Sequence, residues 1–199
     1  MSLSEGKYLV KIARETIENT LKDEPLPDTS DSSETLKEDA GVFVTINRGE
    51  DESSLRGCIG LPYPVKPLVE AVKEAAQGAA FHDPRFPQLK KEELDEITLE
   101  VSVLTPPEEI KVEDPSEIPV EVEIGVDGLI VSKGSRSGLL LPQVAVEYSW
   151  DSEELLCHCC RKAWLPMDAW LESDTKIMKF KSIIFKEESP RGKVKRLEL

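Results

Sequence analysis

The sequence predicts an α+β fold in which helices flank a largely antiparallel sheet. Apolar residues recur at helical spacing near the N-terminus, and elsewhere they alternate with polar residues as in half-buried strands. Turn signals join several strands directly to the next one, and such hairpins require antiparallel pairing. Pro-rich segments interrupt these patterns, so we expect a single domain over residues 1–199, built from two subdomains with a cleft between them.

The first half of the chain is predicted to fold as a helix, a hairpin and a second helix. Ser4 precedes an apolar pattern of helical spacing and is suited to cap it, while Pro25 ends the pattern. β-Branched residues favour two strands joined by a polar loop, and Pro67 suits the first turn of the next helix. Acidic residues among Ser and Pro are typical of a solvated connection. The predicted segments are a helix at 4–21, an acidic loop at 23–40, strands at 42–46 and 55–61, and a helix at 67–80.

The second half of the chain is predicted to contain short strands and two helices. Asp127-Gly128 is a turn signal before a short apolar strand, and Pro142 suits a helix start. Asp151 followed three residues later by Glu154 resembles a capping box. The predicted segments are strands at 97–103, 129–131, 139–141 and 177–185, helices at 142–148 and 151–163, and a polar tail at 188–199.

Composition excludes several classes of function. The 25 Lys and Arg residues against 39 Asp and Glu residues give a formal net charge of −14, so binding to nucleic acid is not expected. A hydrophobic content of 39% is enough for a core, and no apolar run approaches the length of a membrane span. Because Glu5 comes so early, we expect no secretory signal, a cytoplasmic location and reduced thiols at all four cysteines.

Cys58 lies in the most informative motif, Leu55-Arg56-Gly57-Cys58-Ile59-Gly60. Gly57 and Gly60 allow the backbone to bend and a ligand to approach closely, which makes both candidate ligand-binding positions. Arg56 lies two positions before Cys58 on a predicted strand, and a cation on the same face would lower the pKa of the thiol. The alternative is a buried Cys that packs as a small hydrophobic residue in a glycine-kinked strand.

Asp83 and Arg85 belong to a second candidate segment, in which Pro84 and Pro87 stiffen the loop and hold charged side chains in place. Such a loop suits ligand orientation. The alternative is that Asp83 caps a turn and pairs with Arg85 to anchor the loop. His82 could serve as a general base, but a solvent-facing loop histidine is the default.

Glu100, Gln143 and Glu147 are further polar candidates. Glu100 alternates with apolar residues, so it faces away from the core side of its strand, where it is either solvated or directed into a groove. Gln143 and Glu147 are four residues apart on one helix face, where they present polar groups to a cleft or to water.

The segment Cys157-His158-Cys159-Cys160 raises the question of a metal site. Cys157 and Cys160 share a helix face and supply two soft ligands, whereas a closed zinc site needs about four. No second Cys pair occurs in the sequence. We therefore expect no metal, and instead core cysteines beside an exposed His158. Since no phosphate-binding glycine loop or dinucleotide motif is present, no cofactor is expected.

The ordered set of motifs resembles the AMMECR family, named after the Alport syndrome, mental retardation, midface hypoplasia and elliptocytosis chromosomal region. The resemblance implies two subdomains with a groove lined by motif residues. It implies no assigned activity, but prokaryotic members are grouped with Memo-like and radical-SAM proteins. Trp164 departs from the pattern, because prokaryotic relatives often carry Gly there. The matching segments are 55–60, 83–87, 100–105, 125–128, 140–145 and 161–163.

The resemblance makes several separated residues candidates for one site. Cys58, Asp83 and Glu100 are the predicted catalytic residues. The predicted ligand-binding residues are Arg56, Gly57, Gly60, Arg85, Gln143 and Lys162.

Two functions follow from this site as hypotheses. The first is an enzyme or enzyme component that binds a small, anionic ligand near a reactive Cys58. The second is a noncatalytic adaptor that binds a protein partner of the Memo-like or radical-SAM type, because no His is securely paired with Cys58.

Overall fold

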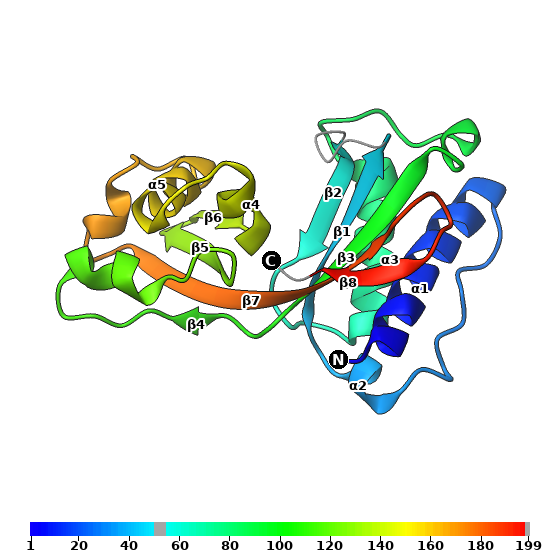
Figure 1. The fold of residues 1–199 in the computed structure, drawn as a ribbon, viewed down its shortest axis with the longest axis horizontal. Helices are drawn as coiled ribbons and strands as arrows, with labels where there is room; N and C mark the ends of the chain where they lie inside the picture. Colours follow the sequence, from blue (N-terminus) through cyan, green and yellow to red (C-terminus); the bar gives the residue numbers. More distant parts are fainter. Residues whose placement is uncertain (50–54, 198–199) are drawn as a thin grey trace. The chain divides into compact units, whose positions relative to one another are not determined.

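Two compact units make up the chain in the computed structural model, which describes residues 1–49 and 55–197. The first unit comprises Met1–Leu104 together with the C-terminal segment from Ile183, and the second comprises Thr105–Ser182. Helices pack on antiparallel strands in each unit, which confirms the predicted α+β class (Figure 1). The cleft predicted between the subdomains stays a prediction.

The first unit is built on an antiparallel sheet. Its helical elements are α1 (Leu3–Lys22), α2 (Glu34–Lys37), α3 (Leu68–Gln77), the π-helical turn η1 (Gly78–His82) and the 3-10 turn η2 (Lys91–Glu93). Its strands are β1 (Gly41–Arg48), β2 (Leu55–Leu61), β3 (Ile97–Leu104), β8 (Val194–Leu197) and the end of β7 (Lys176–Glu187). The strands lie in the order β2-β1-β3-β7, and β8 pairs with β7.

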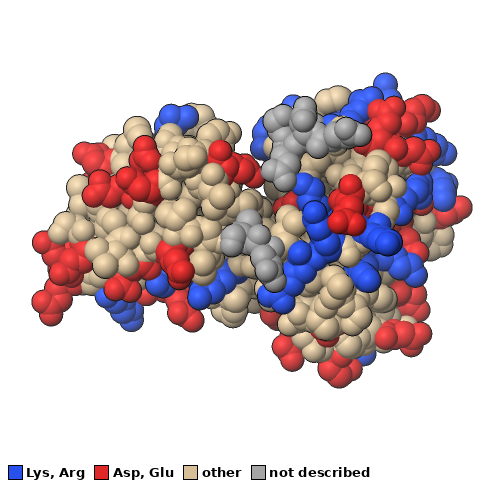
Figure 2. Space-filling model, viewed as in Figure 1, with Lys and Arg blue, Asp and Glu red and all other residues tan. Residues whose placement is uncertain are grey.

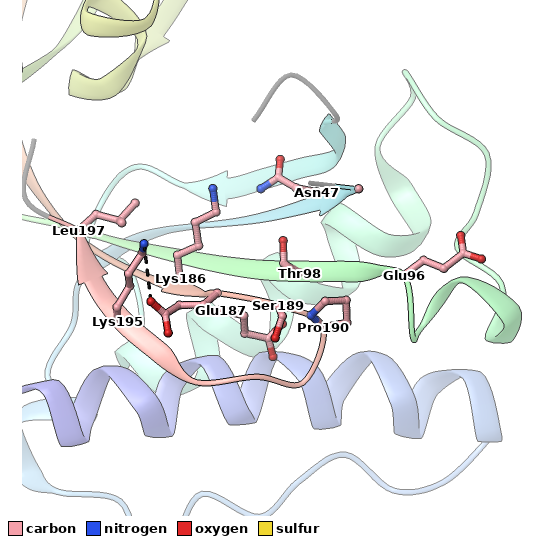
Figure 3. A pocket seen from close by; sticks show the side chains of 11 residues that line it. Asn47, Glu96, Thr98, Lys186, Glu187, Ser189, Pro190, Lys195 and Leu197 are labelled. Carbon is pink, nitrogen blue, oxygen red and sulfur yellow. Dashed lines mark ion pairs between the residues drawn. The ribbon is translucent and has the colours of Figure 1, made fainter. Parts of the chain in front are cut away.

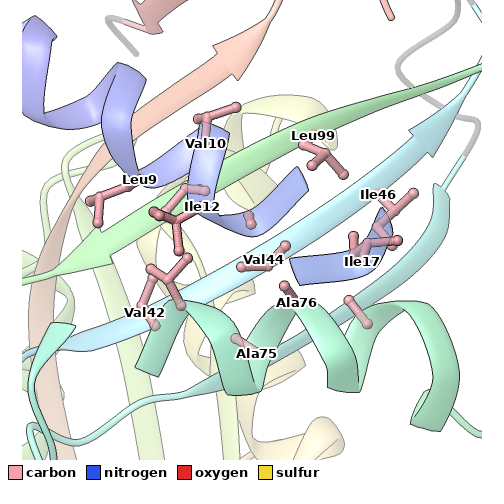
Figure 4. Packing of buried hydrophobic residues seen from close by; sticks show 14 of the residues in the cluster. Leu9, Val10, Ile12, Ile17, Val42, Val44, Ile46, Ala75, Ala76 and Leu99 are labelled. Atoms are coloured by element: carbon pink, nitrogen blue, oxygen red, sulfur yellow. The ribbon is translucent and has the colours of Figure 1, made fainter. Parts of the chain in front are cut away.

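Helices α1 and α3 cover one face of this sheet (Figures 1 and 4). Val44 of β1 and Leu99 of β3 are fully buried against α1 residues such as Leu9 and α3 residues such as Ala75. Because side chains alternate along a strand, the intervening residues lie on the opposite face. These residues are largely polar and define what we call the polar face: Thr45, Asn47, Cys58, Thr98, Glu100 and Ser102.

The start of α1 differs from the prediction. Ser2 is the cap: its hydroxyl accepts the backbone N–H of Glu5, and the Glu5 carboxylate accepts the backbone N–H of Ser2. This reciprocal pair is a capping box, whose Ser-x-x-Glu spacing at residues 2–5 outweighs Ser4 alone. The helix predicted at 67–80 also changes character, since regular α-helix ends at Gln77 and η1 follows.

A buried ion pair joins α1 to the end of β7. Arg14 and Glu187 have relative exposures of 7% and 4%, and Arg14 Nε donates to Glu187 Oε1 at 2.9 Å. Arg14 also donates to the carbonyl oxygens of Leu94 and Ile97, while Glu187 accepts the backbone N–H of Leu99. Both charges are therefore paired and hydrogen-bonded, as buried charges need to be.

The second unit has its own core. Strands lie in the order β7-β5-β6, β4 pairs with β7, and Leu155, Leu156 and Cys159 are buried in the cluster beside β5. The predicted capping box of Asp151 and Glu154 is confirmed. Its elements, besides the start of β7, are β4 (Glu108–Glu109), η3 (Pro115–Glu121), β5 (Asp127–Lys133), β6 (Arg136–Leu140), α4 (Pro142–Glu147), α5 (Ser152–Lys162) and η4 (Ala169–Leu171).

Over the described ranges, no helix combines the length and the apolar content that crossing a membrane requires.

Candidate functional site

Asp83 and Arg85 hold the backbone of Cys58 from two directions. Asp83 Oδ2 accepts the Cys58 backbone N–H at 2.9 Å, and Arg85 Nη2 donates to the Cys58 carbonyl oxygen at 3.1 Å. Arg85 also donates to both carboxylate oxygens of Asp83, from Nε at 3.0 Å and from Nη2 at 2.7 Å. The Asp83–Arg85 pair thus anchors its own loop, which is the alternative considered in the sequence analysis. It also fixes the backbone of Cys58. We call this pair the Cys58 clamp.

Gly57 explains how the loop carrying the clamp reaches β2. A Cβ at position 57 would lie 2.1 Å from the backbone oxygen of Ala79 in η1, so only glycine permits this approach. Asp83 follows η1 directly and is therefore delivered beside Cys58. Gly60 has a similar packing reason, because its Cβ would lie 2.4 Å from the Phe43 ring. The role of both glycines in ligand binding stays a prediction.

Both side chains of the Cys58 clamp are charged, and each stabilises the charge of the other. Hydrogen bonds from the Arg85 side chain, together with the backbone N–H groups of Cys58 and Arg85, lower the pKa of Asp83 to about 2 against the opposing effect of burial. Asp83 is therefore ionised at neutral pH, and we interpret it as a positioning residue. The same pairing raises the pKa of Arg85, with a further electrostatic contribution from Cys58. The Arg85 side chain is 53% exposed, so a ligand can reach its guanidinium group.

Thr45 contacts the Cys58 sulfur, a contact that sequence reasoning missed. Its hydroxyl donates a hydrogen bond to Cys58 Sγ at 3.3 Å. Thr45 lies opposite Cys58 in the β1–β2 register and opposite Glu100 in the β1–β3 register, so the three residues form a row across three strands. Strand pairing is the signal that could have found Thr45. A bulge between Ile46 and Asn47 makes that register hard to read from sequence.

Arg56 has a different partner from the predicted one. Its guanidinium forms two hydrogen bonds to Glu93 of η2, from Nε at 2.8 Å and from Nη2 at 3.1 Å, and its side chain is only 10% exposed. The bulge shifts the register at this point, so simple alternation along β2 does not apply. Arg85, and not Arg56, donates a hydrogen bond to the backbone of Cys58. The predicted role of Arg56 in ligand binding stays a prediction.

Glu100 and Cys58 lie on strands of one antiparallel sheet, as predicted. Glu100 has a relative exposure of 9%, which excludes the solvated alternative. Its carboxylate accepts a long hydrogen bond from Ser102 Oγ at 3.5 Å.

The remaining predicted site residues belong to the second unit. Gln143 is half-buried and Glu147 is exposed, both on α4, and Lys162 is exposed at the end of α5. Their convergence with Cys58 stays a prediction. Trp164 follows α5 with a φ of 58° and a relative exposure of 85%.

The three cysteines of α5 differ from Cys58 in their surroundings. Burial raises the pKa of Cys159 to about 12 and that of Cys160 to about 11, which makes both poor nucleophiles. Cys157 is half-buried. His158 stacks on Trp150 with ring centroids 3.8 Å apart and is also half-buried, so the expectation of an exposed His158 was wrong. Within residues 1–49 and 55–197, no group of three or more His, Cys, Asp or Glu side chains is placed to hold a metal ion.

Comparison with known proteins identifies the lineage of this site. The AMMECR1 family model matches residues 10–185. The chain belongs to the AMMECR1 family. The predicted resemblance is therefore confirmed, and the motifs that carry it include the Cys58 segment and the clamp.

Several archaeal AMMECR1 proteins are similar over nearly their whole length. A protein of Thermococcus gammatolerans is 53% identical over 200 residues, covering 98% of this chain and 96% of its own. Protein PH0010 of Pyrococcus horikoshii is 52% identical over 197 residues, with 98% and 95% covered. The crystal structure of that protein, described as uncharacterized, matches with a TM-score of 0.96 at 51% identity and covers 100% of this chain and 99% of that chain.

Proposed function

We propose that this AMMECR1-family protein is an enzyme or enzyme component in which the Cys58 thiolate reacts with a small, anionic substrate. The observation that carries the proposal is the Cys58 clamp, which fixes both backbone polar groups of one cysteine with an ionised side-chain pair. Rigid placement of a reacting atom is what catalysis requires of a nucleophile.

The surroundings of Cys58 suit a thiolate. Thr45 Oγ1 donates to the sulfur, and the Arg85 guanidinium interacts electrostatically with it. Hydrogen bonding and a nearby cation both favour the charged form of a thiol. In this proposal Thr45 and Asp83 are positioning residues, Arg85 attracts the anionic substrate, and the buried Glu100 lies in the same cross-strand row as Thr45 and Cys58.

Timed alkylation of the whole protein tests the proposal. Iodoacetamide is neutral and iodoacetate carries a carboxylate, but both react in the same way: the bond from Sγ to carbon forms, the carbon–iodine bond breaks, and iodide leaves with the electron pair. Mass spectrometry then counts modification at each cysteine. Cys157 is the internal control, because it is half-buried like Cys58 but lies on a helix without a clamp.

We expect Cys58 to react first with both reagents at mildly acidic pH. The iodoacetate-to-iodoacetamide rate ratio should be about threefold or more higher at Cys58 than at Cys157, because a local cation concentrates an anion. Arg85→Gln should reduce that ratio. If Cys58 reacts last, or only after denaturation, it is a packing residue and the nucleophile proposal is wrong.

Trp164 favours a second candidate function, an adaptor that binds a protein partner. Trp164 is 85% exposed. Because Trp is enriched at the centres of protein interfaces, an exposed Trp is suited to bury against a partner. An inert Cys58, combined with loss of a copurifying protein on Trp164→Ala, would support the adaptor over the enzyme.

A further inference from the structure

Trp164 occupies a helix-end position that usually belongs to glycine. The backbone N–H of Trp164 donates to the carbonyl oxygen of Arg161, and the N–H of Leu165 donates to that of Cys160. These two hydrogen bonds form a Schellman motif, whose left-handed residue is most often Gly. Trp164 fills that place with a φ of 58°, which residues with a Cβ disfavour. The end of α5 therefore carries backbone strain that a glycine would avoid.

The indole of Trp164 does not offset this strain within the molecule. A fully buried Trp removes about 150–250 Å² of surface from water, but Trp164 is 85% exposed. Met167, three residues later in the same connection, is 45% exposed. A residue that breaks a local rule without a compensating gain in the fold is typical of a functional site. The conflict at Trp164 therefore indicates a contact with another molecule.

Three cations lie at the same helix end. Arg136 of β6 donates from Nη1 to the carbonyl oxygen of Trp164 at 2.9 Å. Arg161 and Lys162, the last residues of α5, are exposed. The end of α5 contacts β6 closely, because a Cβ on Gly138 would lie 2.8 Å from the backbone carbon of Lys162. In the part of the chain that the structure describes, no carboxylate forms an ion pair with any of the three cations.

This group of cations belongs to an acidic unit. The second unit contains 15 Asp and Glu residues against eight Lys and Arg residues. Acidic side chains are also more widespread than basic ones over the face of this unit that Figure 2 shows. Lys133, Lys176 and Lys179 form ion pairs with neighbouring carboxylates. The cations beside Trp164 are thus a local exception, and such a positive area attracts negative charge.

The pocket of the first unit that Figure 3 shows differs in this respect. Lys195 lies 3.8 Å from Glu188, and Glu187 is paired with Arg14. Lys186 also has a partner. Because paired charges largely cancel at a distance, the pocket offers a weaker field than the cations beside Trp164.

Carboxylates on the other side of Trp164 favour a protein over a membrane as the partner. Asp168 is exposed and follows Met167 directly, and Glu172 pairs with Lys133. An anionic membrane would meet these carboxylates together with the cations, and the net charge of −14 would repel it. A protein segment can instead place its carboxylates on the cations alone.

We propose that Trp164, Met167, Arg136, Arg161 and Lys162 form a docking site for an acidic segment of another protein. We call it the Trp164 site. An apolar side chain of the segment covers the indole, and Asp or Glu side chains of the segment pair with the two arginines. Trp and Arg are the residues most enriched in interface hot spots, and Arg binds carboxylates with paired hydrogen bonds. This inference rests on the adaptor, the second candidate function, and not on Cys58.

Random peptides displayed on phage test the Trp164 site on the whole protein. Peptides selected on the wild type are sequenced and synthesised, and calorimetry measures their dissociation constants for the wild type, Trp164→Gly and Arg136→Gln/Arg161→Gln. Trp164→Gly removes the backbone strain, so a loss of binding in this variant cannot be attributed to unfolding. Arg161→Gln alone keeps the hydrogen bond from Arg136 and serves if the double variant is unstable.

Matched controls come from the same unit. Val120→Ala removes another side chain of a residue that is 85% exposed. Lys111→Gln/Lys181→Gln removes the same charge as the double arginine variant, at two exposed positions. Thermal unfolding checks that every variant is folded.

We expect the selected peptides to combine Asp or Glu with aromatic or aliphatic residues. Their affinity should fall roughly tenfold or more in Trp164→Gly and in the double arginine variant, about threefold or more in Arg161→Gln, and by less than about twofold in both controls. Changing the acidic residues of a peptide to Asn and Gln should weaken its binding to the wild type much more than its binding to the double arginine variant.

Several results would overturn the inference. Failure to select any peptide, or equal affinity for wild type and Trp164→Gly, would refute the Trp164 site. Trp164-dependent peptides without carboxylates would refute the acidic partner but leave the adaptor function standing. A dimer in analytical ultracentrifugation that Trp164→Gly abolishes would identify a second copy of the chain as the occupant. Trp164-dependent cosedimentation with phosphatidylglycerol vesicles would identify a membrane instead.

Discussion

The carboxylate of Asp83 accepts the backbone N–H of Cys58 at 2.9 Å, so a loop residue fixes a strand residue 25 positions earlier in the chain. Arg85 completes the contact by donating to the carbonyl oxygen of the same cysteine. The interaction uses only backbone atoms of Cys58, while the sulfur accepts a hydrogen bond from Thr45. The clamp therefore combines a stabilising role, tying the loop to β2, with a functional one, holding a sulfur in place.

Acid should weaken the clamp in a defined pH range. The pKa of Asp83 is about 2 in the folded protein against an ordinary value of 3.8, so the ionised carboxylate stabilises the fold above about pH 4. This stabilisation is lost as the pH falls from about 4 to about 2. Asp83→Asn should lower the free energy of unfolding by about 1–2 kcal/mol at pH 6, a value reduced by solvent screening at the half-exposed Arg85. Urea unfolding at several pH values measures the difference.

Asp114→Asn is the control for this experiment. Hydrogen bonds from Ser116 also lower the pKa of Asp114, but Asp114 is a solvent-exposed turn residue, so its replacement should change the pH profile much less. A penalty for Asp83→Asn that stays constant between pH 6 and pH 3 would contradict the role assigned to its charge.

Gly57→Ala should destabilise the first unit. The new Cβ would meet the backbone oxygen of Ala79 at 2.1 Å, and neither strand β2 nor η1 can move without disturbing the clamp. We expect a loss of about 2–3 kcal/mol in the free energy of unfolding, together with slower alkylation of Cys58. Gly134→Ala is the control: its φ is +60° but its Cβ meets nothing within 4 Å, so only backbone strain of about 1 kcal/mol should appear. Equal losses in both variants would argue against a steric role for Gly57.

Thr45→Val should slow the alkylation of Cys58. The valine side chain fills the same space but cannot donate the hydrogen bond that Thr45 Oγ1 gives to Sγ. Loss of one donor to a thiolate should reduce its population at neutral pH, so we expect the rate to fall about threefold to tenfold and the pH midpoint of alkylation to rise. Thr45→Ser keeps the hydroxyl and should retain most of the rate. If Thr45→Ser is as slow as Thr45→Val, packing and not hydrogen bonding explains the effect.

Trp164→Gly should stabilise the protein. Trp164 adopts a φ of 58°, a left-handed conformation that side chains with a Cβ disfavour, and its indole is 85% exposed. Relief of this strain should raise the free energy of unfolding by about 0.5–1 kcal/mol, as denaturant unfolding would show. Trp164→Ala keeps a Cβ at the same backbone position, so it should gain little. A gain in the alanine variant equal to that in the glycine variant would place the cost in the exposed indole and not in the backbone.

Local patterns predicted most of the fold because they act within a few residues. The alternation around Glu100 marked β3, and Asp151 with Glu154 marked the start of α5. The predicted start of α1 was wrong because the prediction considered Ser4 alone. The spacing of Ser2 and Glu5, which allows the reciprocal hydrogen bonds of a capping box, was overlooked. The π-helical turn after α3 left no signal in apolar periodicity, since its side chains continue an Ala-rich stretch.

The candidate site was predictable only in part, because its contacts join segments that are far apart in the sequence. The sequence singled out Cys58, Asp83 and Arg85, but contacts between β2 and a distant loop depend on tertiary packing. Thr45 escaped notice because its partner is set by strand register, which a bulge displaces. The pair of Arg56 with Glu93 likewise joins residues 37 positions apart.

The Arg14–Glu187 pair has a consequence for how the chain is made. Its members are 173 residues apart, and both belong to the first unit, which also needs Phe185 beside Gly6. During synthesis on the ribosome, α1 emerges long before the end of β7, while the second unit is complete almost as soon as Ser182 appears. Protein synthesis adds about 5–20 residues per second, so roughly 10–35 seconds pass between the synthesis of Arg14 and that of its partner Glu187. Folding order during translation is therefore expected to begin with the second unit and to end with the first.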